Sequence, residues 1–156
     1  QPRRSLWPVG DRLMSALMAR RYYVRGCTEL RNNELDDACQ DLQAAVQLIP
    51  SYYEARIAYA TALLRLKDPP RAIQTLRAGL HYTTTGPGRA LLCRALGDAL
   101  VAGGDFLAAE QAFSESQAAS PQASADLHDR LARLRARTGR FDEAFTELLA
   151  AARLSK

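Results

Sequence analysis

The fold is decided by residues 96–113, which read Leu96-Gly97-Asp98-Ala99-Leu100-Val101-Ala102-Gly103-Gly104-Asp105-Phe106-Leu107-Ala108-Ala109-Glu110-Gln111-Ala112-Phe113. Two alanine-rich runs lie on either side of the turn residue Gly104, and Ala is the best helix former. Phe106 follows the turn residue by two places, and Ala109 comes three places later. The stretch therefore predicts two helices that are joined by a tight turn.

The same pattern of turn residue, apolar residue and alanine returns along the chain. It recurs in residues 33–38 and 139–144, and a weaker copy lies in residues 67–72, where Pro69-Pro70 occupy the turn. The alanines that end the four copies are separated by 34, 37 and 35 residues and are Ala38, Ala72, Ala109 and Ala144. A period of this length predicts a helix–turn–helix repeat.

Small residues occupy three fixed positions in every copy. Two helices can approach each other closely only where their side chains are small, while large residues fill the spaces between these points. We therefore expect these positions to lie at the contact of the two helices in each repeat. The twelve residues are Gly26, Ala60, Gly97, Ala132, Ala38, Ala72, Ala109, Ala144, Ala45, Gly79, Ser116 and Ala151.

The pattern resembles the tetratricopeptide repeat family, whose unit of 34 residues is a helix–turn–helix. The match is best in the third copy, at Leu96-Gly97, Leu100, Gly104-Asp105-Phe106, Ala109, Phe113 and Pro121. The resemblance implies an all-α, right-handed superhelical solenoid of four repeats. Their expected ranges within a domain at 19–156 are 19–52, 53–86, 90–123 and 125–156.

Two departures from the family pattern carry structural expectations. Three extra residues fall near 83–88, which predicts a linker between the second and third repeats. Arg135 stands where a large apolar residue is expected, so the packing of the fourth repeat should differ from that of the others.

Residues 1–18 form a separate basic segment, either as a capping helix or as a backward extension of the first helix. Asp11 is expected to be the N-cap, and Leu13, Met14, Leu17 and Met18 follow with helical spacing. Residues 1–31 carry a net charge of +5, whereas the rest of the chain sums to −1, which gives +4 in total. Membrane contact stays open for this segment alone.

The composition is that of an ordinary globular domain, with 47% hydrophobic and 24% charged residues. Apolar stretches are shorter than the roughly 20 residues needed to cross a bilayer. The three cysteines, Cys27, Cys39 and Cys93, are odd in number and scattered, which disfavours a disulfide scaffold. These features favour the cytoplasm.

The sequence predicts neither a catalytic site nor a metal site, and it predicts no cofactor. His81 and His128 are isolated from any Cys or carboxylate pattern, so both are expected to be surface residues. The arginines between 130 and 140 are mixed with acids and lack interleaved aromatic residues. Nucleic-acid binding is therefore disfavoured.

The resemblance implies that the first helix of each repeat lines a concave groove that binds a partner. Arginines outnumber acids among the groove positions, and Arg pairs well with carboxylates. We therefore expect a protein or peptide with acidic character. The expected groove residues are Arg20, Tyr23, Cys27, Arg31, Glu54, Ile57, Thr61, Leu64, Arg65, Leu91, Arg94, Asp98, Arg133 and Arg137.

A non-catalytic scaffold or adaptor is the leading functional hypothesis. A secretion or assembly chaperone and a regulatory domain of a longer polypeptide stay open as alternatives. Phe145, Leu148 and Leu149 near the end of the fourth repeat are expected to be partly uncovered. Solenoids need a polar terminal cap, so self-association through this last helix is a further hypothesis.

Overall fold

The computed structural model describes residues 8–120 and 124–155. Within these ranges the chain forms eight α-helices and no strand, which confirms the all-α prediction. The helices are α1 (Pro8–Asn32), α2 (Leu35–Leu48), α3 (Tyr53–Arg65), α4 (Pro69–Tyr82), α5 (Gly86–Gly103), α6 (Phe106–Ala119), α7 (Ala125–Arg137) and α8 (Phe141–Leu154).

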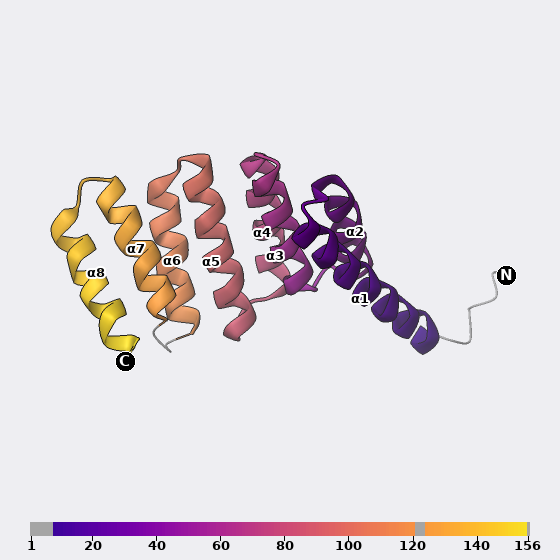
Figure 1. Cartoon of the computed structure of the whole chain (residues 1–156). Helices are drawn as coiled ribbons and strands as arrows, with labels where there is room; N and C mark the ends of the chain where they lie inside the picture. Colours follow the sequence, from indigo (N-terminus) through magenta and orange to yellow (C-terminus); the bar gives the residue numbers. More distant parts are fainter. Residues whose placement is uncertain (1–7, 121–123, 156) are drawn as a thin grey trace.

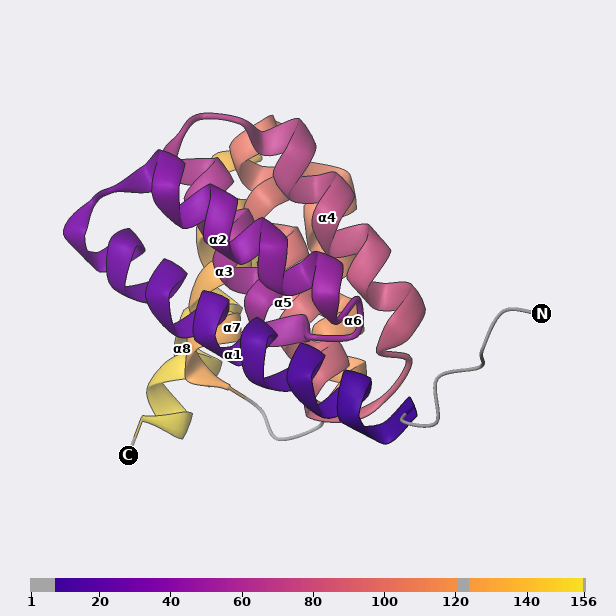
Figure 2. The same ribbon diagram turned by 90° about the vertical axis from the view of Figure 1, so that its right-hand side faces the viewer.

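The helices stand side by side in chain order, with α1 and α8 at opposite ends of the row (Figure 1). Helices pack together within the pairs α1–α2, α3–α4, α5–α6 and α7–α8, and each pair contacts the next one along the row. Such neighbour-only packing defines a solenoid of helical repeats. Figure 2 looks along the row from its N-terminal end, where α1 and α2 lie in front of the other pairs.

The turn inside every pair has the same backbone geometry. One residue in each turn adopts a left-handed conformation: Asn33 at φ 67°, Lys67 at 62°, Gly104 at 84° and Gly139 at 80°. The next amide donates to the carbonyl five residues back, as in Glu34 N to Glu29 O (2.9 Å) and Arg140 N to Arg135 O (2.8 Å). This is the Schellman ending of a helix. Its fourfold recurrence explains the sequence pattern of a turn residue two places before an apolar one.

The small residues lie where the repeat pattern predicts helix contacts. Eleven of the twelve are buried, and Ala151 on α8 is half-buried. A Cβ atom added to Gly26 would lie only 2.6 Å from Leu42 Cγ, and one added to Gly97 would overlap the Phe113 ring. Small size is thus a packing requirement at these positions.

Two expectations about helix boundaries are wrong. Asp11 is not the N-cap of α1, because the helix already includes Pro8 and places Asp11 in its first turn. The extra residues near 83–88 do not form a long linker. Only residues 83–85 separate α4 from α5, and the remainder extend α5 to 18 residues, against 13 in α3 and α7. A proline within the first turn is compatible with such an extended start.

In the described part of the chain, no helix combines the length and the apolar character needed to cross a membrane.

Candidate partner-binding groove

One side of the solenoid carries a groove of about 530 Å³ that is lined by first helices of the four repeats. Its floor is largely apolar and is built from Ile57 and Leu64 of α3 and Leu91 of α5, with Ala58 and Ala95 between them. All five side chains are half-buried, and Ile57, Leu64, Ala58 and Ala95 pack against the core cluster. The small alanines leave the space, and the larger residues supply apolar contact area.

Aromatic side chains form the N-terminal end of the groove. Tyr23 of α1 and Tyr53 of α3 line it, and Tyr52 stacks at a tilt on Tyr23 with ring centroids 5.1 Å apart. Burial raises the pKa of Tyr23 to about 12, so its hydroxyl stays protonated at neutral pH. Tyr23 therefore offers a partner an apolar ring together with a hydrogen-bond donor.

Ion pairs between neighbouring first helices cross the C-terminal half of the groove. Arg94 Nη1 of α5 lies 3.1 Å from Asp126 Oδ2 of α7, and Arg130 Nε of α7 lies 2.8 Å from Asp98 Oδ1 of α5. Arg130 also contacts Asp126 within its own helix. Each of these arginines thus already has a carboxylate partner inside the chain.

A second depression of about 470 Å³ continues from the groove along α7. Arg133 and Arg137 line it, together with Asp129 and Val101. Arg133 Nη2 lies 2.7 Å from Asp129 Oδ2, while the Arg137 guanidinium carbon lies 4.9 Å from the Phe106 ring centroid. Arg137 is therefore oriented by a cation–π contact.

The structure brings ten of the expected groove residues to these two depressions and leaves four elsewhere. Arg20 borders a separate hollow along α1, and Cys27, Arg31 and Arg65 line neither depression. The ten residues are Tyr23, Glu54, Ile57, Thr61, Leu64, Leu91, Arg94, Asp98, Arg133 and Arg137.

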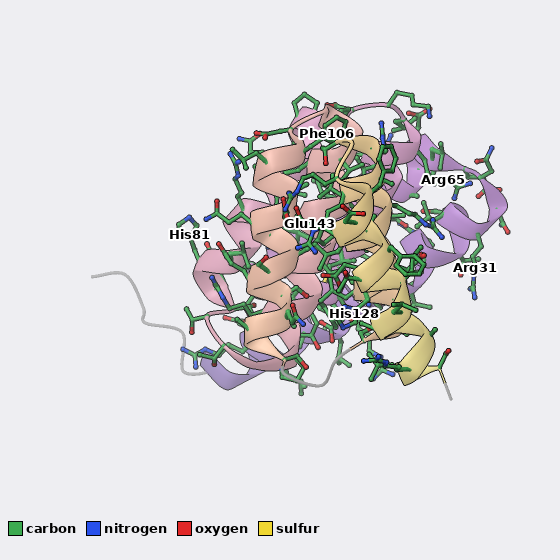
Figure 3. The ribbon with its side chains drawn as sticks, turned by 90° about the vertical axis from the view of Figure 1, so that its left-hand side faces the viewer. Arg31, Arg65, His81, Phe106, His128 and Glu143 are labelled. Carbon is green, nitrogen blue, oxygen red and sulfur yellow. The ribbon has the colours of Figure 1, made fainter. Side chains whose placement is uncertain are left out.

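Arg65 has a structural contact that sequence reasoning missed. Its guanidinium donates to Leu30 O at 2.6 Å and to Asn33 Oδ1 at 2.7 Å, so it holds the turn between α1 and α2. Arg31 lies near it at one edge of the molecule, while His81 lies at the opposite edge (Figure 3).

Arg130 and Tyr53 are groove residues that the sequence did not single out as such. Arg130 follows Asp126 by four places, so the two share one side of α7. That spacing was the available signal. Tyr53 is the first residue of α3, where the groove side of the helix is harder to assign from periodicity.

The prediction that His128 is a surface residue is wrong. Its side chain is largely buried and its Nδ1 faces Glu147 Oε2 of α8. Arg135, which replaces an apolar residue in the fourth repeat, is ion-paired in the same region with Glu110 of α6 and Glu147. A polar network therefore fills the space that large apolar residues would occupy.

The remaining reactive groups do not gather into a site. Cys93 is fully buried, and burial raises the pKa of its thiol and of the Cys39 thiol, which disfavours the reactive thiolate. Across residues 8–120 and 124–155, no group of three or more His, Cys, Asp or Glu side chains is placed to hold a metal ion.

Two models of the tetratricopeptide repeat match the chain, one at residues 29–96 and the other at residues 94–156. The chain belongs to the tetratricopeptide repeat family. No curated protein sequence matches it significantly. The family and the fold define a protein-interaction scaffold in general terms.

Solved structures with the same fold have low sequence identity to the chain. MamA from Desulfovibrio magneticus gives a TM-score of 0.74 at 17% identity, over 88% of this chain and 75% of that one. A thermophilic TPR protein of Thermus thermophilus gives 0.77 at 18%, over 87% and 73%. Pseudomonas aeruginosa PilF gives 0.77 at 18%, over 90% and 62%. At such identities the likeness shows the fold alone.

Proposed function

We propose that the chain is a non-catalytic adaptor that holds a peptide segment of a partner protein in the groove. The observation that carries this proposal is the apolar floor formed by Ile57, Leu64 and Leu91 on the side that the first helices share. A concave apolar surface with a few polar groups around it is the usual form of a ligand site. An apolar side chain of the peptide would fill the space over the floor.

The acidic character of the partner rests on fewer residues than the sequence indicated. Arg94 and Arg130 are balanced by Asp126 and Asp98, so the groove itself is close to neutral. Among the described residues, the ion pairs do not include Arg20 or Arg31, and both are exposed. We place the acidic residues of the peptide at the α1 end, beyond the aromatic Tyr23.

The experiment selects short random peptides on phage against the immobilised chain and then measures binding of an enriched peptide by fluorescence polarisation. Thr61→Tyr should weaken that binding at least about tenfold, because Thr61 is exposed and borders the groove, so a larger side chain fills it. Its matched control is Ser114→Tyr, an exposed position on α6 whose hydroxyl likewise donates to the carbonyl four residues back.

The charge preference has its own variant. Arg20→Glu combined with Arg31→Glu should reduce affinity for peptides with acidic ends and leave peptides with apolar ends bound. Enriched peptides that bind Thr61→Tyr as tightly as the unsubstituted chain would rule out the groove as the site.

A scaffold and a chaperone differ in the state of the partner they hold. Peptides that bind only as part of an unfolded protein would support a secretion or assembly chaperone, whereas a segment held while its protein stays folded supports an adaptor.

We place this activity in the cytoplasm because the cysteines of the described chain are unpaired.

A further inference from the structure

Helix α8 keeps the apolar surface of an inner repeat, although in the described chain no helix packs on its outer side. Leu148 is 48% exposed, whereas its equivalents Leu42, Leu76 and Phe113 are at most 1% exposed. The equivalents are covered because each inner second helix is followed by the first helix of the next repeat. Phe141, Phe145 and Leu149 are also exposed beside Leu148. We refer to these four residues as the terminal face, and Figure 3 shows α8 in front of the other helices on that side.

The opposite end of the solenoid has a different surface. At three positions α1 carries the polar residues Arg21, Arg25 and Thr28, of which Arg25 is paired with Asp41. The equivalent positions in α3, α5 and α7 are apolar and buried. They are Ala55, Leu92, Leu127, Tyr59, Leu96, Leu131, Ala62, Ala99 and Leu134. At these three positions α1 therefore ends the stack with polar residues, whereas Leu17 and Val24 beside them are exposed apolar residues.

The charges around the terminal face are self-complementary. Asp142 and Arg153 are exposed, and within residues 8–120 and 124–155 neither takes part in an ion pair. They are 11 residues apart, which is close to three helical turns, so both lie on the same flank of the apolar stripe. Asp142 comes six residues before Leu148 and Arg153 comes five after it.

The other acidic residues of α8 are already neutralised inside the chain. Glu147 contacts His128 and Arg135, and Glu143 contacts Arg140. The flank of the terminal face thus presents one negative charge six residues before Leu148 and one positive charge five residues after it. An antiparallel second copy of α8, related by a twofold axis beside Leu148, places each Asp142 opposite the other copy's Arg153.

We propose that the terminal face pairs with the terminal face of a second copy of this chain, giving a twofold-symmetric dimer with antiparallel α8 helices. The occupant is a second copy because both the apolar stripe and the flanking charges match their own antiparallel image. The pairing covers Leu148 in the way that a following helix covers Leu42, Leu76 and Phe113. It leaves the groove residues Ile57, Leu64 and Leu91 uncovered, so the dimer carries two grooves.

The first test measures the mass of residues 1–156 by sedimentation velocity and light scattering from about 1 to 100 µM. The mass should rise from 17.2 kDa to twice that value and stop there. Leu148→Asp should abolish the rise with an unchanged helical circular dichroism spectrum. Leu17→Asp is the matched control, because Leu17 is similarly exposed on α1, and it should leave the dimer intact.

The second test exchanges the charges. Asp142→Arg should weaken the dimer by about tenfold, and so should Arg153→Asp, because each places like charges opposite each other twice per dimer. The double variant Asp142→Arg with Arg153→Asp should restore the affinity. Both substitutions are at exposed positions, so the monomer keeps its fold.

Several results would overturn the proposal. A mass of one chain at all concentrations would show that the terminal face does not pair with itself. Growth beyond the dimer, or loss of assembly in Leu17→Asp, would show a head-to-tail contact with α1 in place of a twofold one. Single charge reversals that leave the dimer unchanged, or a double variant that fails to recover, would exclude the antiparallel arrangement.

Discussion

Arg135 Nη1 of α7 lies 2.6 Å from Glu147 Oε1 of α8. The same guanidinium reaches back to α6, where its Nε lies 3.1 Å from Glu110 Oε1. All three side chains are at least about four-fifths buried, so solvent screens these contacts only partly. A single arginine thus joins three helices at a position where the second and third repeats have the buried Leu63 and Leu100.

Replacing Arg135 with methionine should destabilise the chain by about 2 kcal/mol, because it leaves two largely buried carboxylates with less compensation. Urea unfolding monitored by circular dichroism would measure the loss. Arg133→Met is the control, because it removes the exposed Arg133–Asp129 pair and should cost about 0.5 kcal/mol or less. Equal losses in the two variants would show that the Arg135 contacts have no special weight.

Gly97→Ala should destabilise the chain by about 1–3 kcal/mol, because the added methyl group overlaps the Phe113 ring between α5 and α6. Thermal and urea unfolding would both report this change. The double variant Gly97→Ala with Phe113→Leu should lose less stability than the sum of the two single variants. The two residues are in contact, so their effects are not additive.

Gly103→Ala provides a comparison within the same helix. Its added methyl group would meet Ile73 Cδ1 at 3.5 Å, an ordinary contact distance. We expect Gly103→Ala to be neutral or to stabilise the chain by up to about 1 kcal/mol, because alanine lowers the entropy of the unfolded chain. Destabilisation equal to that of Gly97→Ala would mean that the steric account of Gly97 is wrong.

The stability of the fourth repeat should fall in acid. Burial by itself would raise the pKa of Glu110, but hydrogen bonds from Arg140 and Arg135 outweigh it, and the pKa is lowered. A lowered folded-state pKa adds stability above the unfolded pKa of roughly 4.3, and this stability is lost as pH falls through the folded value. Glu110→Gln should therefore show a shallower decline in unfolding free energy below about pH 4.5 than the unsubstituted chain.

Glu29 should affect the pH dependence of stability in the opposite direction to Glu110. Burial raises the pKa of Glu29, and one of its carboxylate oxygens is buried without a hydrogen-bond partner in the described structure. Its contribution to stability therefore improves as pH falls, and Glu29→Gln should make the acid decline steeper. Identical pH profiles for Glu29→Gln and Glu110→Gln would contradict both assignments.

The turns and the helix contacts could be predicted from sequence because they depend on local chemistry. Gly104 and Gly139 tolerate a left-handed conformation without a Cβ, and Asn33 adopts it more readily than most residues. Lys67 has no such preference, and Pro69 stands two places after it where the other copies have a large apolar residue, so the second turn was the weakest copy in the sequence. The twelve small positions followed from the same repeat period.

The ion pairs between helices could not be predicted in the same way, because their partners lie far apart in the sequence. Arg94–Asp126 and Asp98–Arg130 are both 32 residues apart, slightly less than one repeat. The offset depends on how far one first helix slides along the next, and apolar periodicity does not specify that distance. The acids that pair with Arg135 likewise lie in two other helices. The sequence therefore showed that Arg135 breaks the apolar pattern, but it did not show which carboxylates pair with it.

Salt bridges join the third and fourth repeats on both sides of their contact. Arg94 and Asp126 join α5 to α7 beside the groove, while Arg140 contacts Glu110 of α6 at 2.6 Å on the side of the second helices. A change in curvature at this point stretches one set of pairs or the other. These salt bridges therefore oppose bending of the solenoid at this contact. Because salt screens them, the bending stiffness decreases as salt concentration rises.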